Sequence, residues 1–394
     1  MVAQSMDQPL VIEGATAILP AGPLEDAVLV ARDGRIAAVG SAAEVPVPAG
    51  ARRVPAAGLL LAPGLIELQL NGGFGHDFTA RPETVWEVAA RLPAHGVTAF
   101  LPTIVTSPPG TADRAREVLA GGPMGAGGGA TPLGLHIEGP FIHPAASGAH
   151  DRGLLREPDI DARRAARDWT VENGVRLVTL APELPGALEL IEQLVEQGVR
   201  VSAGHSTADY TIGEAGIAAG IRYATHLFNA MPPLGHRDPG LVGALLADPR
   251  VTLGMIPDGI HVHPAIVELV FEAAGARFSA VTDATAGLGM AGGSFVLAGQ
   301  AIVVDDSSVR LATDGRLAGS ALAPDEALRR LHHMTGCSAA AALATMTSVP
   351  ARLLGLDDRG QLVVGSRADV VLFTPELQVV ATFIDGQCVH GQWS

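Results

Sequence analysis

The chain has 394 residues, of which 48% are apolar and 17% charged, so its composition excludes an intrinsically disordered protein. Its formal net charge of −15 predicts that it binds neither nucleic acid nor an anionic membrane surface. All 26 basic residues are arginine, which excludes a lysine Schiff base, a Walker A lysine and a carbamylated lysine between two metal ions.

Neither a targeting signal nor a membrane span is predicted. Residues 1–10 lack the basic segment and apolar run of a signal peptide, and no run reaches the roughly 18 apolar residues of a transmembrane helix. Cys337 and Cys388 match no zinc-finger spacing, so we expect both to be reduced, buried thiols. These features predict a cytoplasmic protein.

Short strands are predicted at both ends of the chain. Residues 10–19 and 27–39 are rich in β-forming residues, and an Asp-Gly pair inside the second segment is a hairpin signal. The C-terminal segment contains similar apolar runs separated by turn residues. Because neither end is long enough for an independent sandwich, we expect residues 1–61 and 358–394 to form one small β-sandwich domain.

Between these ends, short apolar runs alternate with segments of helical periodicity. Eight strands with their helices suit a (β/α)8 TIM-type barrel of about 250 residues, and we assign this α/β barrel to residues 62–357. A doubly wound parallel sheet is the alternative, because periodicity alone does not show that a barrel closes. The predicted strands span residues 65–70, 97–101, 133–137, 175–180, 200–203, 223–227, 251–256 and 278–282.

Polar residues stand at the downstream ends of four predicted strands, namely Glu138, His205, His226 and Asp283. In a barrel, those ends form the face on which active sites lie. A glutamate and two histidines suit a catalytic divalent metal that keeps a position open for water. Asp283 is then a carboxylate able to take the proton of that water. A single histidine near a strand end is more often structural, so the prediction depends on the combination.

The chain carries eight short motifs in the order PGLIELQLNG, GLHIEGPFIHP, VTLAPE, AGHS, THLFNAMPPLGHRDPG, DGIHV, VTDAT and LAGSAL. From about residue 63 onward, this order resembles the N-acetylglucosamine-6-phosphate deacetylases of the amidohydrolase superfamily. The resemblance implies a metal-bearing (β/α)8 barrel with a small β domain from both chain termini. It implies hydrolysis of N-acetyl-D-glucosamine 6-phosphate to D-glucosamine 6-phosphate and acetate. It also implies a homodimer, in which a neighbouring subunit can contribute to the phosphate site.

Matched position by position, the resemblance implies that Glu138, His205 and His226 hold the metal. Asp283 would be the general base that later protonates the leaving amine, and His150 would contact and polarise the acetamide carbonyl or bind a neighbouring sugar hydroxyl. A guanidinium suits the phosphate, since it offers paired donors. The groups that would bind the sugar and its phosphate are Asn229, the backbone N–H of Ala230, Arg237 and His261.

One position departs from many amidohydrolases, which carry His-x-His at the end of the first strand and hold a second metal there. Here the slot contains Gln69 and Asn71, and amides are poor ligands for transition metals. With no lysine to be carbamylated, the sequence predicts one divalent metal per chain. Zinc suits the three ligands, and iron, manganese and cobalt are alternatives.

Other interpretations stay open. The motifs do not distinguish N-acetylgalactosamine 6-phosphate, which is a C4 epimer. Another amidohydrolase, acting on an N-acyl amino acid or a cyclic amide, would leave the phosphate-binding pair idle. Outside enzymes, a metal-free sugar-phosphate-binding barrel is the alternative, although the chain retains Asp283 and all three predicted ligands.

Two further signals receive structural interpretations. The glycine motif from Gly125 to Ala130 precedes a strand and does not open a helix, so we expect a surface loop and not a dinucleotide site. His136 lies two residues before Glu138, and alternation along a strand places both side chains on one face. We expect His136 to lie behind the predicted ligands.

Overall fold

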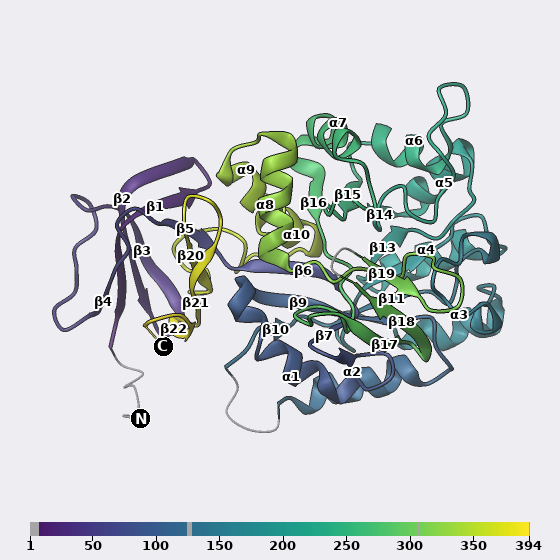
Figure 1. Ribbon diagram of the computed structural model, residues 1–394, viewed down its shortest axis with the longest axis horizontal. Coiled ribbons are helices and arrows are strands. Elements are labelled where there is room, and N and C mark those ends of the chain that lie inside the picture. Colours follow the sequence, from purple (N-terminus) through teal and green to yellow (C-terminus); the bar gives the residue numbers. More distant parts are fainter. Residues whose placement is uncertain (1–7, 124–127, 306–307, 394) are drawn as a thin grey trace.

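The structure is a computed structural model that describes residues 8–123, 128–305 and 308–393. It contains a larger body with a parallel sheet and helices, and a smaller body of strands beside it (Figure 1). Gly125 and Gly127 of the predicted surface loop lie outside the described residues, as does most of segment 1–10.

The larger body is built on a sheet in which the paired strands run parallel. The strand order is β10-β9-β11-β12-β13-β14-β15-β16, and β6 also pairs with β9. An isolated parallel bridge joins Leu70, the last residue of β6, to Ala284, which follows β16. The strands are β6 (Leu65–Leu70), β9 (Val97–Val105), β10 (Thr131–Pro132), β11 (Leu135–Glu138), β12 (Val175–Leu180), β13 (Arg200–Ala203), β14 (Ile221–Ala224), β15 (Thr252–Met255) and β16 (Phe278–Ala280).

The predicted strands of the larger body mostly occur within a few residues of their expected positions. Residues 223–227 differ, since β14 ends at Ala224. His226 and Phe228 have φ angles of 29° and 77°, and a non-glycine residue in this left-handed region is typical of a turn. His226 therefore lies in the turn after β14, and the prediction that the strand continues through it was wrong.

The smaller body is one eight-stranded sheet made from both ends of the chain. β5 pairs antiparallel with β20, which places Leu61 opposite Leu372, and β2 and β3 form the predicted Asp-Gly hairpin. Ile12 and Phe383 are fully buried in one apolar cluster shared by the two ends. The strands are β1 (Leu10–Leu19), β2 (Gly22–Arg32), β3 (Arg35–Ser41), β4 (Arg52–Pro55), β5 (Leu60–Pro63), β20 (Val370–Phe373), β21 (Val379–Ile384) and β22 (Gln387–His390).

Helices follow most of the parallel strands, as the alternating sequence pattern predicts. In α4, for example, Leu190, Ile191 and Leu194 are buried at helical spacing, while the intervening residues are polar or exposed. The helices are α1 (Val85–Ala89), α2 (Thr111–Gly121), α3 (Ile160–Ala165), α4 (Ala187–Glu196), α5 (Tyr210–Ala219), α6 (Gly240–Ala247), α7 (Pro264–Ala274), α8 (Pro324–Thr335), α9 (Ala339–Ala344) and α10 (Ser348–Leu354).

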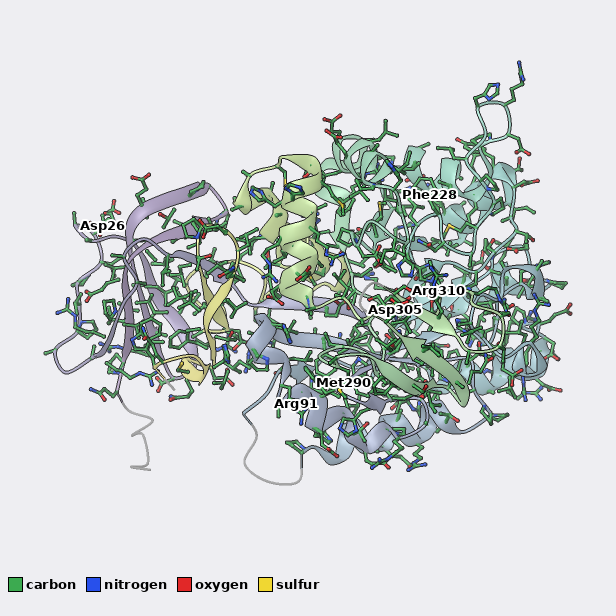
Figure 2. All side chains as sticks on the ribbon, in the orientation of Figure 1. Asp26, Arg91, Phe228, Met290, Asp305 and Arg310 are labelled. Atoms are coloured by element: carbon green, nitrogen blue, oxygen red, sulfur yellow. The ribbon has the colours of Figure 1, made fainter. Side chains whose placement is uncertain are left out.

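A small antiparallel sheet, for which the sequence analysis gives no strands, lies between β16 and α8 in the chain. It consists of β17 (Gly293–Leu297), β18 (Gln300–Val304) and β19 (Val309–Leu311), and its apolar side chains pack against Val105 at the end of β9. Asp305 and Arg310 mark this sheet near the middle of the larger body in Figure 2. A two-stranded ribbon, β7 (Gly72–Gly73) and β8 (His76–Asp77), follows β6.

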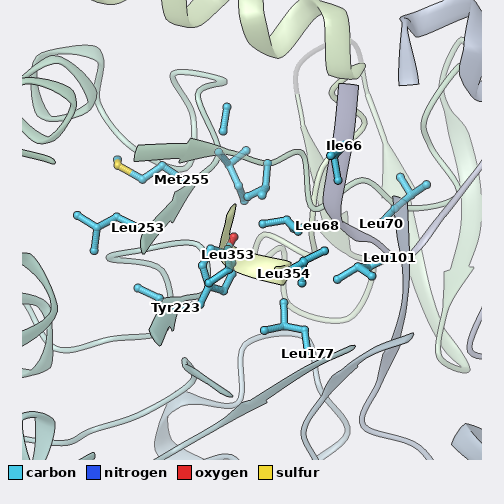
Figure 3. Packing of buried hydrophobic residues seen from close by; sticks show 14 of the residues in the cluster. Ile66, Leu68, Leu70, Leu101, Leu177, Tyr223, Leu253, Met255, Leu353 and Leu354 are labelled. Atoms are coloured by element: carbon cyan, nitrogen blue, oxygen red, sulfur yellow. The ribbon is translucent and has the colours of Figure 1, made fainter. Parts of the chain in front are cut away.

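The apolar core of the larger body lies between strands and helices. Ile66, Leu68 and Leu70 of β6 belong to the same buried cluster as Leu353 and Leu354 of α10 (Figure 3). Such side chains alternate along β6 with polar ones that are equally buried. The apolar residues therefore fix the helices on the sheet and leave the other face of the strand for polar groups.

Polar side chains meet on that other face. His136 Nε2 lies 2.7 Å from Thr179 Oγ1, which lies 2.7 Å from Thr225 Oγ1. His136 Nδ1 lies 3.2 Å from the carbonyl oxygen of Leu68, although β6 and β11 are not neighbours in the sheet. Burial lowers the pKa of His136 to about 4, so the ring is neutral at physiological pH.

Among the described helices, none combines the length and the hydropathy needed to cross a membrane. Cys337 and Cys388 are unpaired within the described chain and are half-buried. The expectation that both thiols are buried was therefore wrong. Cys388 lies on β22, which is an edge strand of its sheet, and Cys337 follows the end of α8.

Candidate active site

One pocket at the carboxyl ends of the parallel strands collects most of the predicted site residues. Its volume is about 140 Å³. Several strands bring groups to it, because a side chain at the end of a strand or in the following turn faces this edge of the sheet. The predicted residues that line the pocket are Asn71, Glu138, His150, His205, His226, Asn229, Ala230, His261 and Asp283.

Glu138, His205 and His226 converge on one point of this pocket. Glu138 Oε1 lies 3.2 Å from His205 Nε2 and 3.2 Å from His226 Nε2, and the two imidazole nitrogens are 3.1 Å apart. Ligand atoms about 2.0 Å from a tetrahedral ion are themselves about 3.3 Å apart. The three atoms therefore have the spacing of one face of the tetrahedron that surrounds a zinc ion.

The remaining ring nitrogen of His205 fits this arrangement, whereas that of His226 lacks a partner among the described residues. His205 Nδ1 lies 2.9 Å from the carbonyl oxygen of Ala146, so Nδ1 carries the proton and Nε2 turns its lone pair to the pocket. His226 Nδ1 is buried without a hydrogen-bond partner among the described residues. A lone pair and a carboxylate oxygen that face each other at this distance favour a cation between them, so the residues fit a divalent metal.

His150 adds a donor beside this triangle. Its Nε2 lies 3.9 Å from Glu138 Oε2, and one donor atom each of Glu138, His150 and His205 lies within 4.8 Å of the others. His150 Nδ1 lies 2.7 Å from Thr106 Oγ1. Burial, assisted by the charge of His205, lowers the pKa of His150 to about 3. The ring of His150 is therefore neutral, and its Nε2 can contact a molecule bound in the pocket.

The charge of the cluster depends on Glu138. Burial alone would raise the pKa of Glu138, but its close contacts with the imidazoles of His205 and His226 outweigh burial and hold that pKa well below its usual range. Burial opposes protonation of His226, yet the hydrogen bond with Glu138 raises the pKa of this histidine. Glu138 is thus an ionised carboxylate at neutral pH, which is the form that binds a metal ion.

Asp283 lies beside the cluster in a buried position. Its Oδ1 accepts hydrogen bonds from Asn71 Nδ2 at 2.7 Å and from Gln69 Nε2 at 3.1 Å. Burial, together with the negative charge of Glu138, raises the pKa of Asp283 to about 6. A carboxylate with a pKa just below neutral is suited to exchange a proton with a reacting group.

Gln69 and Asn71, which stand where many amidohydrolases hold a second metal, contact Glu138 and Asp283. Gln69 Nε2 donates to Glu138 Oε1 and to Asp283 Oδ1, each at 3.1 Å. Gln69 Oε1 and Asn71 Oδ1 are buried and have no hydrogen-bond partner within the described ranges. The amide group of Gln69 links the two carboxylates at the end of the first strand, where many amidohydrolases carry imidazoles.

The predicted substrate-binding residues separate into two groups. Asn229, Ala230 and His261 line the pocket with the metal ligands, whereas Arg237 is absent from its lining. Arg237 is exposed on the loop between β14 and α6, and this loop projects from the body beside α5 and α6 (Figure 1). A single chain therefore does not bring Arg237 to the other predicted residues.

Strained backbone marks the candidate site. His205, His226 and Asp283 have φ angles of 50°, 29° and 49°, and Ala230 has one of 52°. Non-glycine residues in this region are uncommon, and each costs on the order of 1 kcal/mol or more. Because three of the four predicted residues at strand ends are strained, the surrounding structure must hold them in place, as it does at sites where side-chain direction matters more than stability.

Some lining residues were missed by the sequence analysis. Leu297 of β17 and Leu317, which follows β19, reach the pocket from the small antiparallel sheet. The alternating run 293–304 with its Ala-Gly turn was the available signal for this hairpin. Asp258 contacts His261 behind the pocket, and only its place in an Asp-Gly turn three residues before the histidine pointed to it.

Residues 60–389 match the amidohydrolase family. The N-acetylglucosamine-6-phosphate deacetylase of Mus musculus is 42% identical over 346 residues, which cover 84% of this chain and 84% of that protein. The N-acetylgalactosamine-6-phosphate deacetylase of Escherichia coli O157:H7 is 38% identical over 371 residues, which cover 93% of this chain and 95% of that protein.

Among solved structures, that of the N-acetyl-D-glucosamine-6-phosphate deacetylase from Mycobacterium smegmatis is similar. It is a mutant in complex with N-acetyl-D-glucosamine-6-phosphate, with a TM-score of 0.87 and 34% identity. The alignment covers 97% of this chain and 99% of that chain. The similarity therefore includes both the parallel sheet and the sheet formed from the two chain ends.

Proposed function

Because this chain belongs to the amidohydrolase family, and within it to the N-acetylglucosamine-6-phosphate deacetylases, we propose that it hydrolyses the acetamide of N-acetyl-D-glucosamine 6-phosphate. The products are D-glucosamine 6-phosphate and acetate. The observation that carries the proposal is the triangle of Glu138, His205 and His226, with Asp283 beside it in a pocket at the strand ends.

Glu138, His205 and His226 would hold one divalent metal per chain, and zinc matches their spacing. Such an ion, when bound, supplies Lewis acidity toward a carbonyl oxygen and lowers the pKa of water. Iron, manganese or cobalt would satisfy the same ligands. His226 is placed in this set because its Nε2 is closer to Glu138 than that of His150 is.

Asp283 would act as the general base and then as the general acid. It takes a proton from the attacking water as the tetrahedral carbon forms, and it delivers that proton to the departing sugar nitrogen. The hydrogen bonds from Gln69 and Asn71 both fall on Oδ1, which leaves Oδ2 for this proton. His150 would donate to the oxygen that becomes negative, a contact that typically lowers the barrier by a few kcal/mol.

Asn229, the backbone N–H of Ala230 and His261 would bind the sugar phosphate. Arg237 would reach the phosphate from a second copy of the chain, because on its own chain it is exposed and does not line the pocket in which the other residues lie. We therefore propose a homodimer. A guanidinium from the partner supplies the paired donors that a phosphate group prefers.

For the fold, we infer that the parallel sheet is a closed (β/α)8 barrel spanning residues 62–357. The bridge between Leu70 and Ala284 and the hydrogen bond from Thr282 N to Glu67 Oε2 connect β6 with the segment that follows β16. His136 also contacts β6 across the interior. We further propose that residues 1–61 and 358–394 form one β-sandwich domain, in which the single eight-stranded sheet folds into two layers over an apolar cluster shared by both ends.

The test is acetate release from N-acetylglucosamine 6-phosphate and N-acetylgalactosamine 6-phosphate, with and without a chelator. Turnover of the gluco substrate that the chelator abolishes supports the proposal. Preference for the galacto epimer would favour the second candidate, which rests on the 38% identity with the E. coli protein. No acetate from either sugar would reject both, and chelator-resistant turnover would reject the metal.

A further inference from the structure

Behind the pocket, Asp258 and His261 form a buried acid–imidazole pair. Asp258 Oδ2 lies 2.6 Å from His261 Nδ1, and the two side chains are only 5% and 6% exposed. Both residues belong to the segment between β15 and α7. A distance this short indicates a charge-assisted hydrogen bond, which is roughly twice as strong as one between neutral groups.

The turn that carries this pair is held by other contacts as well. Asp258 Oδ1 accepts hydrogen bonds from the backbone N–H groups of Ile260 and His261, each at 2.8 Å. Arg330 of α8 donates from Nη1 to the carbonyl oxygen of Asp258 at 2.8 Å. One carboxylate oxygen therefore shapes the turn, and the other is directed only at the imidazole.

This contact decides what His261 can offer to the pocket. Because Asp258 accepts the proton on Nδ1, the ring has only Nε2 left for a ligand. Within the part of the chain that the structure describes, the ring is hydrogen-bonded through Nδ1 and not through Nε2, and His261 lines the pocket that contains Glu138 and Asp283.

We propose that Asp258 is a positioning residue for recognition of the substrate's phosphate, acting through His261. An anion at Nε2 requires a proton there, so the ring then carries both protons and a positive charge. The carboxylate of Asp258 stabilises this imidazolium and holds its Nε2–H toward the pocket. The inference rests on the proposed function, in which His261 binds the phosphate.

The electrostatics of Asp258 support this role. Burial alone would raise the pKa of Asp258, but hydrogen bonds from the His261 side chain and from the backbone outweigh it and keep that pKa below its usual value. Asp258 is therefore ionised at neutral pH and available to balance a charged ring. The acid does not itself line the catalytic pocket, so it acts on the phosphate only through His261.

Two substitutions of Asp258 distinguish its role in shaping the turn from the effect of its negative charge. Asparagine is favoured in such turns, so Asp258→Asn keeps an oxygen for the two backbone N–H groups but removes the negative charge opposite Nδ1. Asp258→Ala removes both. Asp325→Asn is the matched control, because Asp325 lies 2.8 Å from His95 Nδ1 in a second acid–imidazole pair outside the pocket.

The measurement is steady-state hydrolysis of N-acetylglucosamine 6-phosphate, with inorganic phosphate as a competing probe. For Asp258→Asn we expect KM and the phosphate inhibition constant to rise about 10-fold or more, with kcat within about twofold of the parent. Asp325→Asn should leave KM unchanged. In a His261→Asn background, Asp258→Asn should add little, because the two residues act as one unit.

Different results would overturn the inference about Asp258 and the proposed function. If Asp258→Asn retains the parent KM while Asp258→Ala loses activity, the side chain only shapes the turn and the inference fails, although the proposed function stands. Equal additive losses in both His261 backgrounds would also overturn it. If the parent chain releases no acetate from the phosphorylated sugar, the proposed function fails and the inference fails with it.

Discussion

Asp283 combines burial, a strained backbone and two amide donors on a single oxygen, and these donors leave its other oxygen for the proton transfer that we propose. Asparagine has nearly the same shape but cannot accept and return a proton. We expect Asp283→Asn to lose about 10²- to 10⁴-fold in kcat, because general acid–base catalysis is removed while the metal ligands remain. Acetate release measures the loss.

The controls for this variant are its metal content and Tm, which should match those of the parent chain. Near-normal turnover in Asp283→Asn would show that another group moves the proton. A loss of bound metal together with activity would instead assign Asp283 to the ligand set.

Gln69 and Asn71 determine the expected metal stoichiometry. Their amide nitrogens already donate to Glu138 and Asp283, and amide oxygens are weak ligands for transition metals. We expect one tightly bound divalent ion per chain by metal analysis, and loss of turnover on chelation that added zinc restores. Two tightly bound ions in the active parent chain would contradict this expectation.

A matched gain-of-site variant sharpens the experiment. In Gln69→His/Asn71→His, imidazoles replace the amides at the end of the first strand, and a second ion of lower affinity should bind there. The same titration of the parent and the variant therefore tests whether these two residues limit the site to one metal.

At the residue scale, sequence reasoning finds groups that a family motif or a strand end displays. Glu138, His205, His226 and Asp283 meet in one pocket because each ends or follows a parallel strand. Asp258 was missed, because nothing in the sequence shows that its second oxygen faces an imidazole ring. The pairing depends on how the turn folds back, which is a property of the backbone and not of spacing.

At the scale of elements, the β17–β18 hairpin forms one wall of the pocket through Leu297. Asp77 of β8 holds its tip, since Oδ2 accepts a hydrogen bond from the backbone N–H of Ala298 at 2.7 Å. We expect Asp77→Ala to increase hydrogen exchange of residues 293–304 about 10-fold or more, because a buried hydrogen bond to a carboxylate is lost. Mass spectrometry of exchanged peptides measures the change.

The control for the hairpin is Asp161→Ala, which alters an exposed carboxylate on α3 and should leave exchange in 293–304 unchanged. A loosened hairpin should also raise KM, since Leu297 would no longer be held against the substrate. Unchanged exchange and unchanged KM in Asp77→Ala would show that packing against Val105 alone fixes the hairpin.

Elements with strong periodicity were predictable, and elements that depend on tertiary contacts were not. β6, β12 and β13 coincide with their predicted ranges because each is a short apolar run between turn residues. β14 ends early because His226 adopts a left-handed conformation. The surrounding sequence has the pattern of a strand and gives no sign of this turn. β17 to β19 are short and partly polar, and their stability comes from packing on β9.

At the scale of the whole molecule, the fully buried carboxyl of Glu67 couples stability to pH. Burial, opposed by hydrogen bonds from Gln69 and Thr282, raises its pKa to about 8, compared with 4.5 for a free glutamate. Between these values the folded chain holds a proton that the unfolded chain has lost, so stability falls as pH rises. We expect Tm to decrease from about pH 5 to about pH 8.

Glu67→Gln cannot ionise, so its Tm should decrease less over the same range. Metal binding affects parent and variant alike, and their difference therefore isolates Glu67. Glu376→Gln, a substitution at an exposed glutamate, should follow the parent. Parallel curves for Glu67→Gln and the parent would place the titration elsewhere.

The exposed position of Arg237 also belongs to this scale, because in the proposed homodimer a second copy of the chain supplies this residue to the phosphate site. We expect Arg237→Ala to raise KM about 10-fold or more with little change in kcat. Mixing this variant with the inactive Asp283→Asn variant should restore low-KM turnover. In a mixed dimer, the Asp283→Asn chain supplies Arg237 to the pocket of the Arg237→Ala chain, in which Asp283 is intact. If mixed dimers show no recovery, Arg237 either serves the pocket of its own chain or does not bind the phosphate.

The sheet shared by both chain ends cannot be completed until the ribosome has made nearly the whole chain. The ribosome makes β5 long before its partner β20, because all of the parallel sheet lies between them. At roughly 5–20 residues per second, the nascent chain keeps an open strand edge at Leu60–Pro63 for tens of seconds. Open edges promote association with other chains, so a pause of the ribosome in this interval would expose the unfinished sheet to aggregation and to chaperones.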